Sequence, residues 1–183
     1  MISQAVVWPW LVFGGTGCAD GASVASGADA DVGRAEGASL CDEYGGPGVV
    51  STVVQDLVIP EIAADCRVNQ YFLALPPEAL GHLAECLTIQ VQELFGCEGV
   101  VYAGATDARG RACRSMAEAH AGLQLSKGDF DALIDDVVVA MTKAGIAEEH
   151  IAAAAPALLG MEGDIVAQPT IEAPTYPLGE ACE

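Results

Sequence analysis

Apolar side chains recur at helical spacing in several stretches of the chain. The clearest run follows Ser126 at steps of i, i+3, i+4, i+7, i+8 and i+11, and it comprises Phe130, Leu133, Ile134, Val137, Val138 and Met141. Ser126 and Asp129 have the spacing of an N-terminal capping box, and Gly145 follows the last turn. This pattern predicts an amphipathic helix that buries one face.

Three further segments have the same period. Residues 49–62 carry a valine-rich stripe in which Pro60 is expected to kink or end the helix. Residues 77–94 carry a leucine stripe that stops at Gly96, and residues 147–159 are alanine-rich. Neither an internal repeat nor an alternation of strands and helices is visible, so the sequence predicts an all-α domain.

The two ends of the chain have a different composition. Residues 1–18 contain a short apolar run, followed by small residues before Cys18. This arrangement resembles the signal peptide and acylation site of bacterial lipoproteins. No Lys or Arg precedes that run, so an untidy N-terminus without an export role is the alternative. We expect a linker at 19–39, the folded domain at 40–166 and a proline-containing tail at 167–183.

Composition narrows the possible partners. The chain has 183 residues, of which 52% are hydrophobic. It contains 7 Lys and Arg residues but 26 Asp and Glu residues. The resulting net charge of -19 repels nucleic acid and anionic membrane surfaces, so no nucleic-acid partner is expected. The sequence contains no phosphate-binding loop, dinucleotide fingerprint or HExxH motif.

Six short motifs follow one another in an informative order. They are YGG at 44–46, DCRVNQYF at 65–72, YAG at 102–104, SMAEAHAGL at 115–123, FDAL at 130–133 and GDIV at 163–166. In this order and spacing they resemble a group I truncated haemoglobin. That resemblance implies a two-over-two sandwich of helices around haem and reversible binding of a diatomic gas ligand such as dioxygen, nitric oxide or carbon monoxide.

The resemblance also implies roles for individual residues. His120, on a short helix after the irregular stretch 104–114, takes the place of the proximal ligand of the haem iron. Phe72 is expected to pack on the haem face, and Tyr102 and Arg114 to meet its propionates. Further haem-wall positions, for which ordinary core burial is the alternative, are Met116, Leu125 and Phe130.

The distal side departs from the family. Val58 stands where these globins usually have a tyrosine that donates to bound dioxygen, and Leu83 and Leu87 occupy the two pocket positions of the distal helix. We therefore expect an apolar distal wall. Gln90 is expected to point away from it, and His82 to be exposed at the surface.

Seven cysteines suit an exported protein with disulfides. Cys97 and Cys113 bracket a stretch that is longer than in the family, and we expect them to be bonded to each other. Six cysteines allow 15 pairings in total if Cys18 is acylated. No CxxC motif points to a zinc site instead.

Three classes of function remain open at this point. The first is a haem globin that binds a diatomic ligand reversibly, and it is exported to the periplasm or anchored by lipid at Cys18. The second is a haem enzyme, either a nitric oxide dioxygenase or peroxidase-like, although such reactions usually need a distal donor. The third is a globin-fold interaction domain without haem, which the presence of His120 disfavours.

Overall fold

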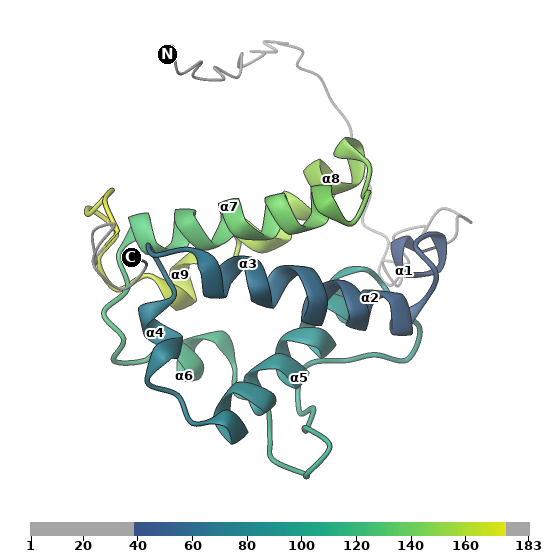
Figure 1. Cartoon of the computed structure of the whole chain (residues 1–183), viewed down its shortest axis with the longest axis horizontal. Coiled ribbons are helices and arrows are strands. Elements are labelled where there is room, and N and C mark those ends of the chain that lie inside the picture. The colour runs from purple at the N-terminus through teal and green to yellow at the C-terminus, as the bar shows by residue number, and fades with distance from the viewer. Residues whose placement is uncertain (1–38, 175–183) are drawn as a thin grey trace, which may run out of the picture. The chain divides into compact units, whose positions relative to one another are not determined.

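The computed structural model describes residues 39–174, in which two pairs of long helices form the domain (Figure 1). In the first pair, α2, η1 and α3 make one continuous helix that packs against α5, and in the second pair α7 packs against α8. The two pairs meet where η1 and α3 contact α7. The bounds are α2 (Pro47–Val53), η1 (Val54–Val58), α3 (Ile59–Ala64), α5 (Pro77–Leu94), α7 (Lys127–Lys143) and α8 (Glu148–Leu159). The all-α prediction is confirmed.

Short helices fill the connections between these long ones. They are α1 (Leu40–Glu43), α4 (Gln70–Leu73), α6 (Met116–His120) and α9 (Glu162–Ile165). Residues 95–115, between α5 and α6, form a long segment without helix. The helix over 47–64 is apolar and long enough for a membrane span by length and composition, but here it packs against α5 and α7 inside the domain.

Pro60 neither ends nor interrupts its helix. The segment just before it, η1, is a π-helical turn in which the Ile59 amide donates to the carbonyl of Val54, five residues back. A proline has no N–H and its ring crowds the carbonyl four residues earlier, which here belongs to Asp56. The wider π turn accommodates the missing N–H and the ring of Pro60 inside the helix, so the helix continues to Ala64.

The start of α7 has the predicted capping box. The Asp129 amide donates to Ser126 Oγ at 3.1 Å, and the Ser126 amide donates to Asp129 Oδ2 at 2.7 Å. The chain after α9 packs across this helix end, where the Gly128 amide donates to the carbonyl of Ile171. A Cβ atom on Gly128 would lie 2.2 Å from the carbonyl carbon of Ala173, so only glycine permits this approach.

The structure contains two disulfides between described cysteines, and the predicted Cys97–Cys113 pairing is wrong. Cys41 is bonded to Cys97, and Cys86 is bonded to Cys113. The physical reason is that Cys97 follows α5 directly and lies beside α1, whereas the long loop then folds back along α5 and brings Cys113 to Cys86. The residues of the predicted signal peptide, the acylation site at Cys18 and most of the linker lie outside the described part of the chain.

Candidate functional site

A cavity of about 950 Å³ lies between the helix pairs and the long loop. This volume is near the upper end of the roughly 300–1,000 Å³ typical of sites for small molecules and cofactors. The residues that the sequence assigned to a haem site line it, namely Val58, Phe72, Leu83, Leu87, Tyr102, Met116, His120, Leu125 and Phe130. The fold thus brings together side chains that are as far apart in sequence as Val58 and Phe130.

His120 is held in a defined orientation at the end of α6. This helix starts with a second capping box, in which the Glu118 amide donates to Ser115 Oγ at 3.3 Å and the Ser115 amide donates to Glu118 Oε2 at 3.0 Å. Nδ1 of His120 lies 2.8 Å from the carbonyl oxygen of Met116. Because a carbonyl can only accept, Nδ1 carries the proton, and the lone pair of the neutral ring is on Nε2. A histidine fixed in this tautomer is prepared to bind a metal through Nε2.

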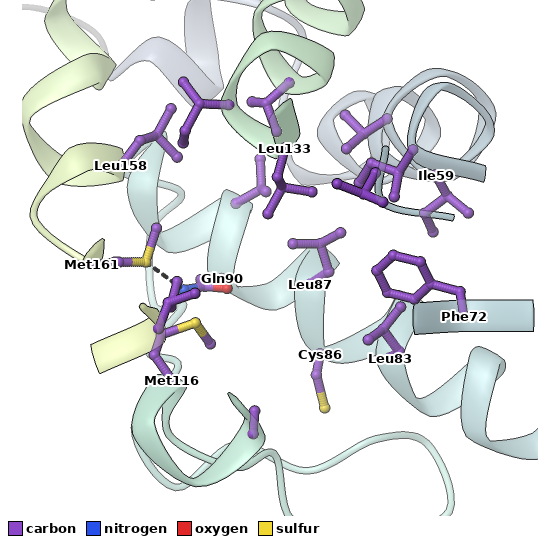
Figure 2. Close-up of a pocket in the computed structure, with 18 of the residues that line it drawn as sticks. Ile59, Phe72, Leu83, Cys86, Leu87, Gln90, Met116, Leu133, Leu158 and Met161 are labelled. Carbon is purple, nitrogen blue, oxygen red and sulfur yellow. Dashed lines mark hydrogen bonds between the residues drawn. The ribbon is translucent and has the colours of Figure 1, made fainter. Parts of the chain in front are cut away.

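The wall formed by α5 is mostly apolar but includes one amide. Figure 2 shows Leu83, Leu87 and Phe72 around the same space, and Gln90 further along α5. The expectation that Gln90 points away from the cavity is wrong, because residues 83, 87 and 90 are spaced i, i+4 and i+7 and share one helix face. Gln90 Nε2 lies 3.1 Å from Met161 Sδ, which is a weak acceptor.

Basic and hydroxyl groups lie along the part of the cavity formed by the long loop. Tyr102 donates to the backbone carbonyl of Arg114 at 2.7 Å, and both residues line the cavity, as does Arg111. Burial raises the pKa of the Tyr102 hydroxyl, which keeps it a neutral donor. Arg111 was not predicted to be part of the site, although a signal was present: three of the seven basic residues, Arg109, Arg111 and Arg114, lie within six positions.

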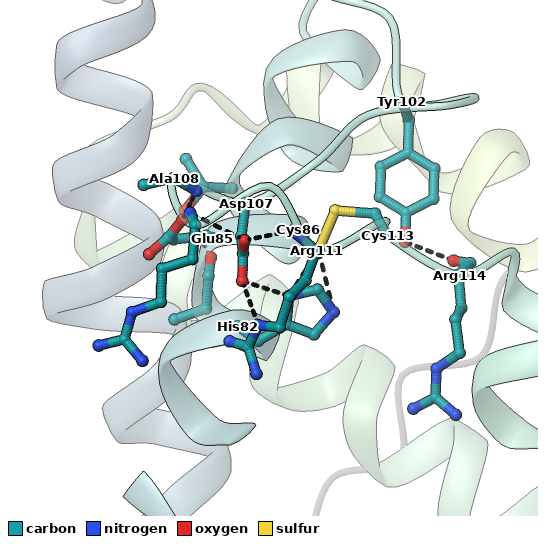
Figure 3. Close-up of a disulfide and its surroundings, with 12 residues drawn as sticks. His82, Glu85, Cys86, Tyr102, Asp107, Ala108, Arg111, Cys113 and Arg114 are labelled. Atoms are coloured by element: carbon teal, nitrogen blue, oxygen red, sulfur yellow. Dashed lines mark hydrogen bonds and ion pairs between the residues drawn. A yellow bond between two sulfur atoms is a disulfide. The ribbon is translucent and has the colours of Figure 1, made fainter. Parts of the chain in front are cut away.

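The prediction that His82 is exposed at the surface is wrong. The residue lines the cavity, and its Nδ1 is 2.8 Å from Oδ2 of Asp107 (Figure 3). Asp107 is buried, with 1% of its side chain exposed. The contact depends on the long loop folding over α5, which no local pattern at His82 indicates. His150 is also partly buried and contacts the Tyr44 hydroxyl at 2.7 Å; Tyr44 lines the cavity, but His150 does not.

Solved structures with the same arrangement of helices are truncated haemoglobins. Truncated hemoglobin from Tetrahymena pyriformis, in its Fe(III) form, is 21% identical and superposes with a TM-score of 0.57, over 70% of this chain and 98% of that one. The 2/2 hemoglobin from Synechococcus, in a cyanomet state with covalently attached heme, is 21% identical with a TM-score of 0.54 and the same coverage.

These likenesses establish the fold of the domain. The chain has the truncated (2/2) haemoglobin fold, and the prediction of a two-over-two helical sandwich is confirmed. No protein-family model matches the chain, and no curated protein matches it in sequence. The assignment to group I stays a prediction.

Proposed function

We propose that this protein is a haem-binding globin in which Nε2 of His120 is the iron ligand. The observation that carries the proposal is the 2.8 Å contact between His120 Nδ1 and the Met116 carbonyl inside a cavity of cofactor size. That contact fixes the tautomer and leaves the coordinating nitrogen available. The truncated haemoglobin fold also supports the proposal that the protein binds haem.

The rest of the cavity fits haem chemically. A porphyrin is a flat apolar ring, and Phe72, Leu83, Leu87 and Val58 supply apolar surface that excludes water from it. The two propionates of haem are anions, and the guanidinium groups of Arg111 and Arg114 lie in the same lining. We assign the propionates to this side because the chain is otherwise strongly acidic.

Haem bound here would be held through Nε2 of His120, and it would supply an iron atom that takes up a diatomic gas. The function that follows is reversible binding of dioxygen, nitric oxide or carbon monoxide. Val58, Leu83 and Leu87 have no hydrogen-bond donor, so they hold the ligand by shape alone. A polar ligand such as dioxygen is therefore expected to leave quickly, whereas carbon monoxide is less affected.

Titration with haemin tests the proposal. The wild-type protein should give a sharp Soret band at one equivalent, and His120→Gly should lose it or give a weak, altered band. Free imidazole should restore the spectrum of His120→Gly, because it can occupy the space of the missing ring. His150→Ala is the matched control, since His150 lies outside the cavity lining. An unchanged spectrum in His120→Gly without imidazole would refute the assignment.

A haem enzyme, either a nitric oxide dioxygenase or peroxidase-like, is the second candidate. One observation favours it: Gln90 brings an amide donor to the cavity beside Leu87. Its present partner, Met161 Sδ, is weak enough to be exchanged for a polar ligand. If Gln90→Leu accelerates dioxygen release about 5-fold or more, the amide is a distal donor and this candidate gains support.

We also propose that the protein is exported, with Cys18 as an acylation site. The disulfides Cys41–Cys97 and Cys86–Cys113 support an oxidising compartment. Expression in a bacterial host with a labelled fatty acid tests this proposal. Label should enter the wild-type protein and not Cys18→Ser, and the wild-type protein should be found in the membrane fraction. Unlabelled protein in the cytoplasm would contradict it.

A further inference from the structure

A second cluster of reactive groups lies at the Cys86–Cys113 disulfide (Figure 3). His82 precedes Cys86 by one helical turn on α5, and its ring nitrogens are 3.7 and 3.8 Å from Cys86 Sγ. Nδ1 of the same ring lies 2.8 Å from Asp107 Oδ2. A sulfur, an imidazole and a carboxylate are therefore in contact in that order, which is the arrangement that activates a thiol nucleophile.

Asp107 is fixed as an ionised group. Its Oδ1 accepts the backbone amides of Arg109 at 3.0 Å and Arg111 at 2.8 Å, and its Oδ2 accepts Arg111 Nε at 2.7 Å as well as His82. Burial alone would raise the pKa of Asp107, but these hydrogen bonds outweigh it and hold the pKa well below its usual range. A carboxylate can only accept, so His82 Nδ1 carries a proton, while both ring nitrogens lie at similar distances from Cys86 Sγ.

The two sulfurs of this disulfide are in different environments. Cys86 is buried, with 7% of the residue exposed, and lies against His82. Cys113 is partly exposed on the loop. The other described disulfide has no such difference, because Cys41 and Cys97 are 0% and 4% exposed. An incoming thiolate thus reaches Cys113 first, and Cys86 is placed as the leaving group.

We propose that Cys86 and Cys113 form a thiol–disulfide exchange site that accepts two electrons from a dithiol reductant, with His82 and Asp107 stabilising the Cys86 thiolate. One thiolate of the reductant attacks Cys113 Sγ and forms a mixed disulfide. The Cys86–Cys113 bond breaks, and its electron pair stays on Cys86 Sγ, whose charge is balanced when His82 Nε2 takes up the proton that the first reductant thiol releases on ionising. The second thiol of the reductant then displaces Cys113, which takes up a proton, and the reductant leaves as its own disulfide.

This site is separate from the proposed iron ligand and adds a second chemistry to the domain. A leaving thiolate that is stabilised by a cation departs faster, so exchange at Cys86–Cys113 should be faster than at an ordinary buried disulfide. Reduction would also remove a covalent link between the long loop and α5, and leave hydrogen bonds such as Ala108 N to Glu85 Oε2 to hold them together.

The test is carried out on the full-length protein with two thiol probes. In dithiothreitol, followed by alkylation and peptide mapping, Cys86–Cys113 should be reduced at least about tenfold faster than Cys41–Cys97. After brief exposure to glutathione and acid quenching, glutathione should be found on Cys113 with Cys86 as the free thiol. Equal or slower reduction of Cys86–Cys113, or glutathione on Cys86, would overturn the proposal.

The variant His82→Gln tests the role of the imidazole. Glutamine cannot carry the positive charge, so the reduction rate of Cys86–Cys113 should fall about tenfold. Cys41–Cys97 in the same sample is the internal control, and its rate should not change. An unaltered or increased rate at Cys86–Cys113 would remove His82 from the mechanism.

Discussion

The carboxyl groups of Asp65 and Asp136 face each other beside the guanidinium of Arg67. Asp65 ends α3 and Asp136 lies in the middle of α7, so the pair joins the two layers of the sandwich. Arg67 Nη2 is 2.6 Å from Asp65 Oδ2 and 3.9 Å from Asp136 Oδ1. Burial tends to raise the pKa of Asp65, but the hydrogen bonds and charge of Arg67 outweigh it and lower the pKa. Below the raised pKa of Asp136, about 7, the pair therefore carries one negative charge, which is on Asp65.

Asp136→Asn should stabilise the protein above neutral pH. Burial, together with the charge on Asp65, raises the pKa of Asp136 to about 7 from an ordinary value of 3.8. Between these values the folded protein holds a proton that the unfolded chain has released, so wild-type stability falls as the pH rises through this window. Asparagine resembles the protonated form and does not titrate.

Urea unfolding at about pH 5 and about pH 8 measures this effect. The difference in free energy of unfolding between Asp136→Asn and the wild type should be larger at the higher pH. Asp131→Asn is the control, because Asp131 lies on the same helix, is 44% exposed and pairs with Lys127 and not with Arg67. A difference that is independent of pH would contradict the assignment of the proton to Asp136.

Gly128→Ala should weaken the contact between α7 and the chain that follows α9. The new Cβ would meet the backbone of Ala173 at 2.2 Å, and backbone cannot rotate away as a side chain can. We expect a loss of about 1–3 kcal/mol, as for other overpacked sites. Gly81→Ala in α5, where a Cβ meets nothing within 4 Å, should instead stabilise the protein by about 0.5–1 kcal/mol. Thermal unfolding of both variants checks the pair.

Local patterns in the sequence were enough to predict the long helices and many of the residues that line the cavity. The apolar period and the Ser126 capping box depend on residues within a few turns of one another, so they can be recognised without knowing the fold. The positions of His120 and Phe72 were predicted from the resemblance to truncated haemoglobins, which rests on the order and spacing of the motifs, and both residues line the cavity. Their roles toward haem stay predictions.

Two of the contacts that the sequence did not predict depend on the path of the long loop. The Cys86–Cys113 bond and the burial of His82 arise only when this loop folds back over α5. Loop paths are determined by tertiary contacts such as the four hydrogen bonds to Asp107, which leave no periodic trace in the sequence. Gln90 was a different case, since its i+7 relation to Leu83 was visible in the sequence.

Val58→Tyr should slow dioxygen release from the haem-loaded protein. Val58 lines the cavity, and a tyrosine hydroxyl there would donate a hydrogen bond worth about 1–3 kcal/mol to a polar ligand, which corresponds to about 5- to 150-fold slower release. Carbon monoxide release should change little. Val138→Tyr, outside the cavity lining, is the control in stopped-flow measurements. Equal slowing of both gases would indicate a steric effect and not a hydrogen bond.

Replacing Cys41 and Cys97 together by alanine should lower the free energy of unfolding by about 2–4 kcal/mol, because their bond closes a long loop of the unfolded chain. The sequence separation is 56 residues. Denaturant unfolding of the double variant measures the loss. Since the Cys86–Cys113 bond is independent of this pair, peptide mapping of the variant should still find it intact. Mapping that linked Cys97 to Cys113 in the wild type would contradict the pairing itself.

The Cys86–Cys113 bond also determines how the cavity can deform. Only Arg114 and Ser115 separate Cys113 from α6, which carries His120 at its end. Two walls of the cavity, α5 and α6, are therefore connected by a covalent strap a few residues long. A large flat molecule that enters after this strap has closed cannot do so by parting these two helices. Reduction of the Cys86–Cys113 bond would remove this constraint on the separation of α5 and α6.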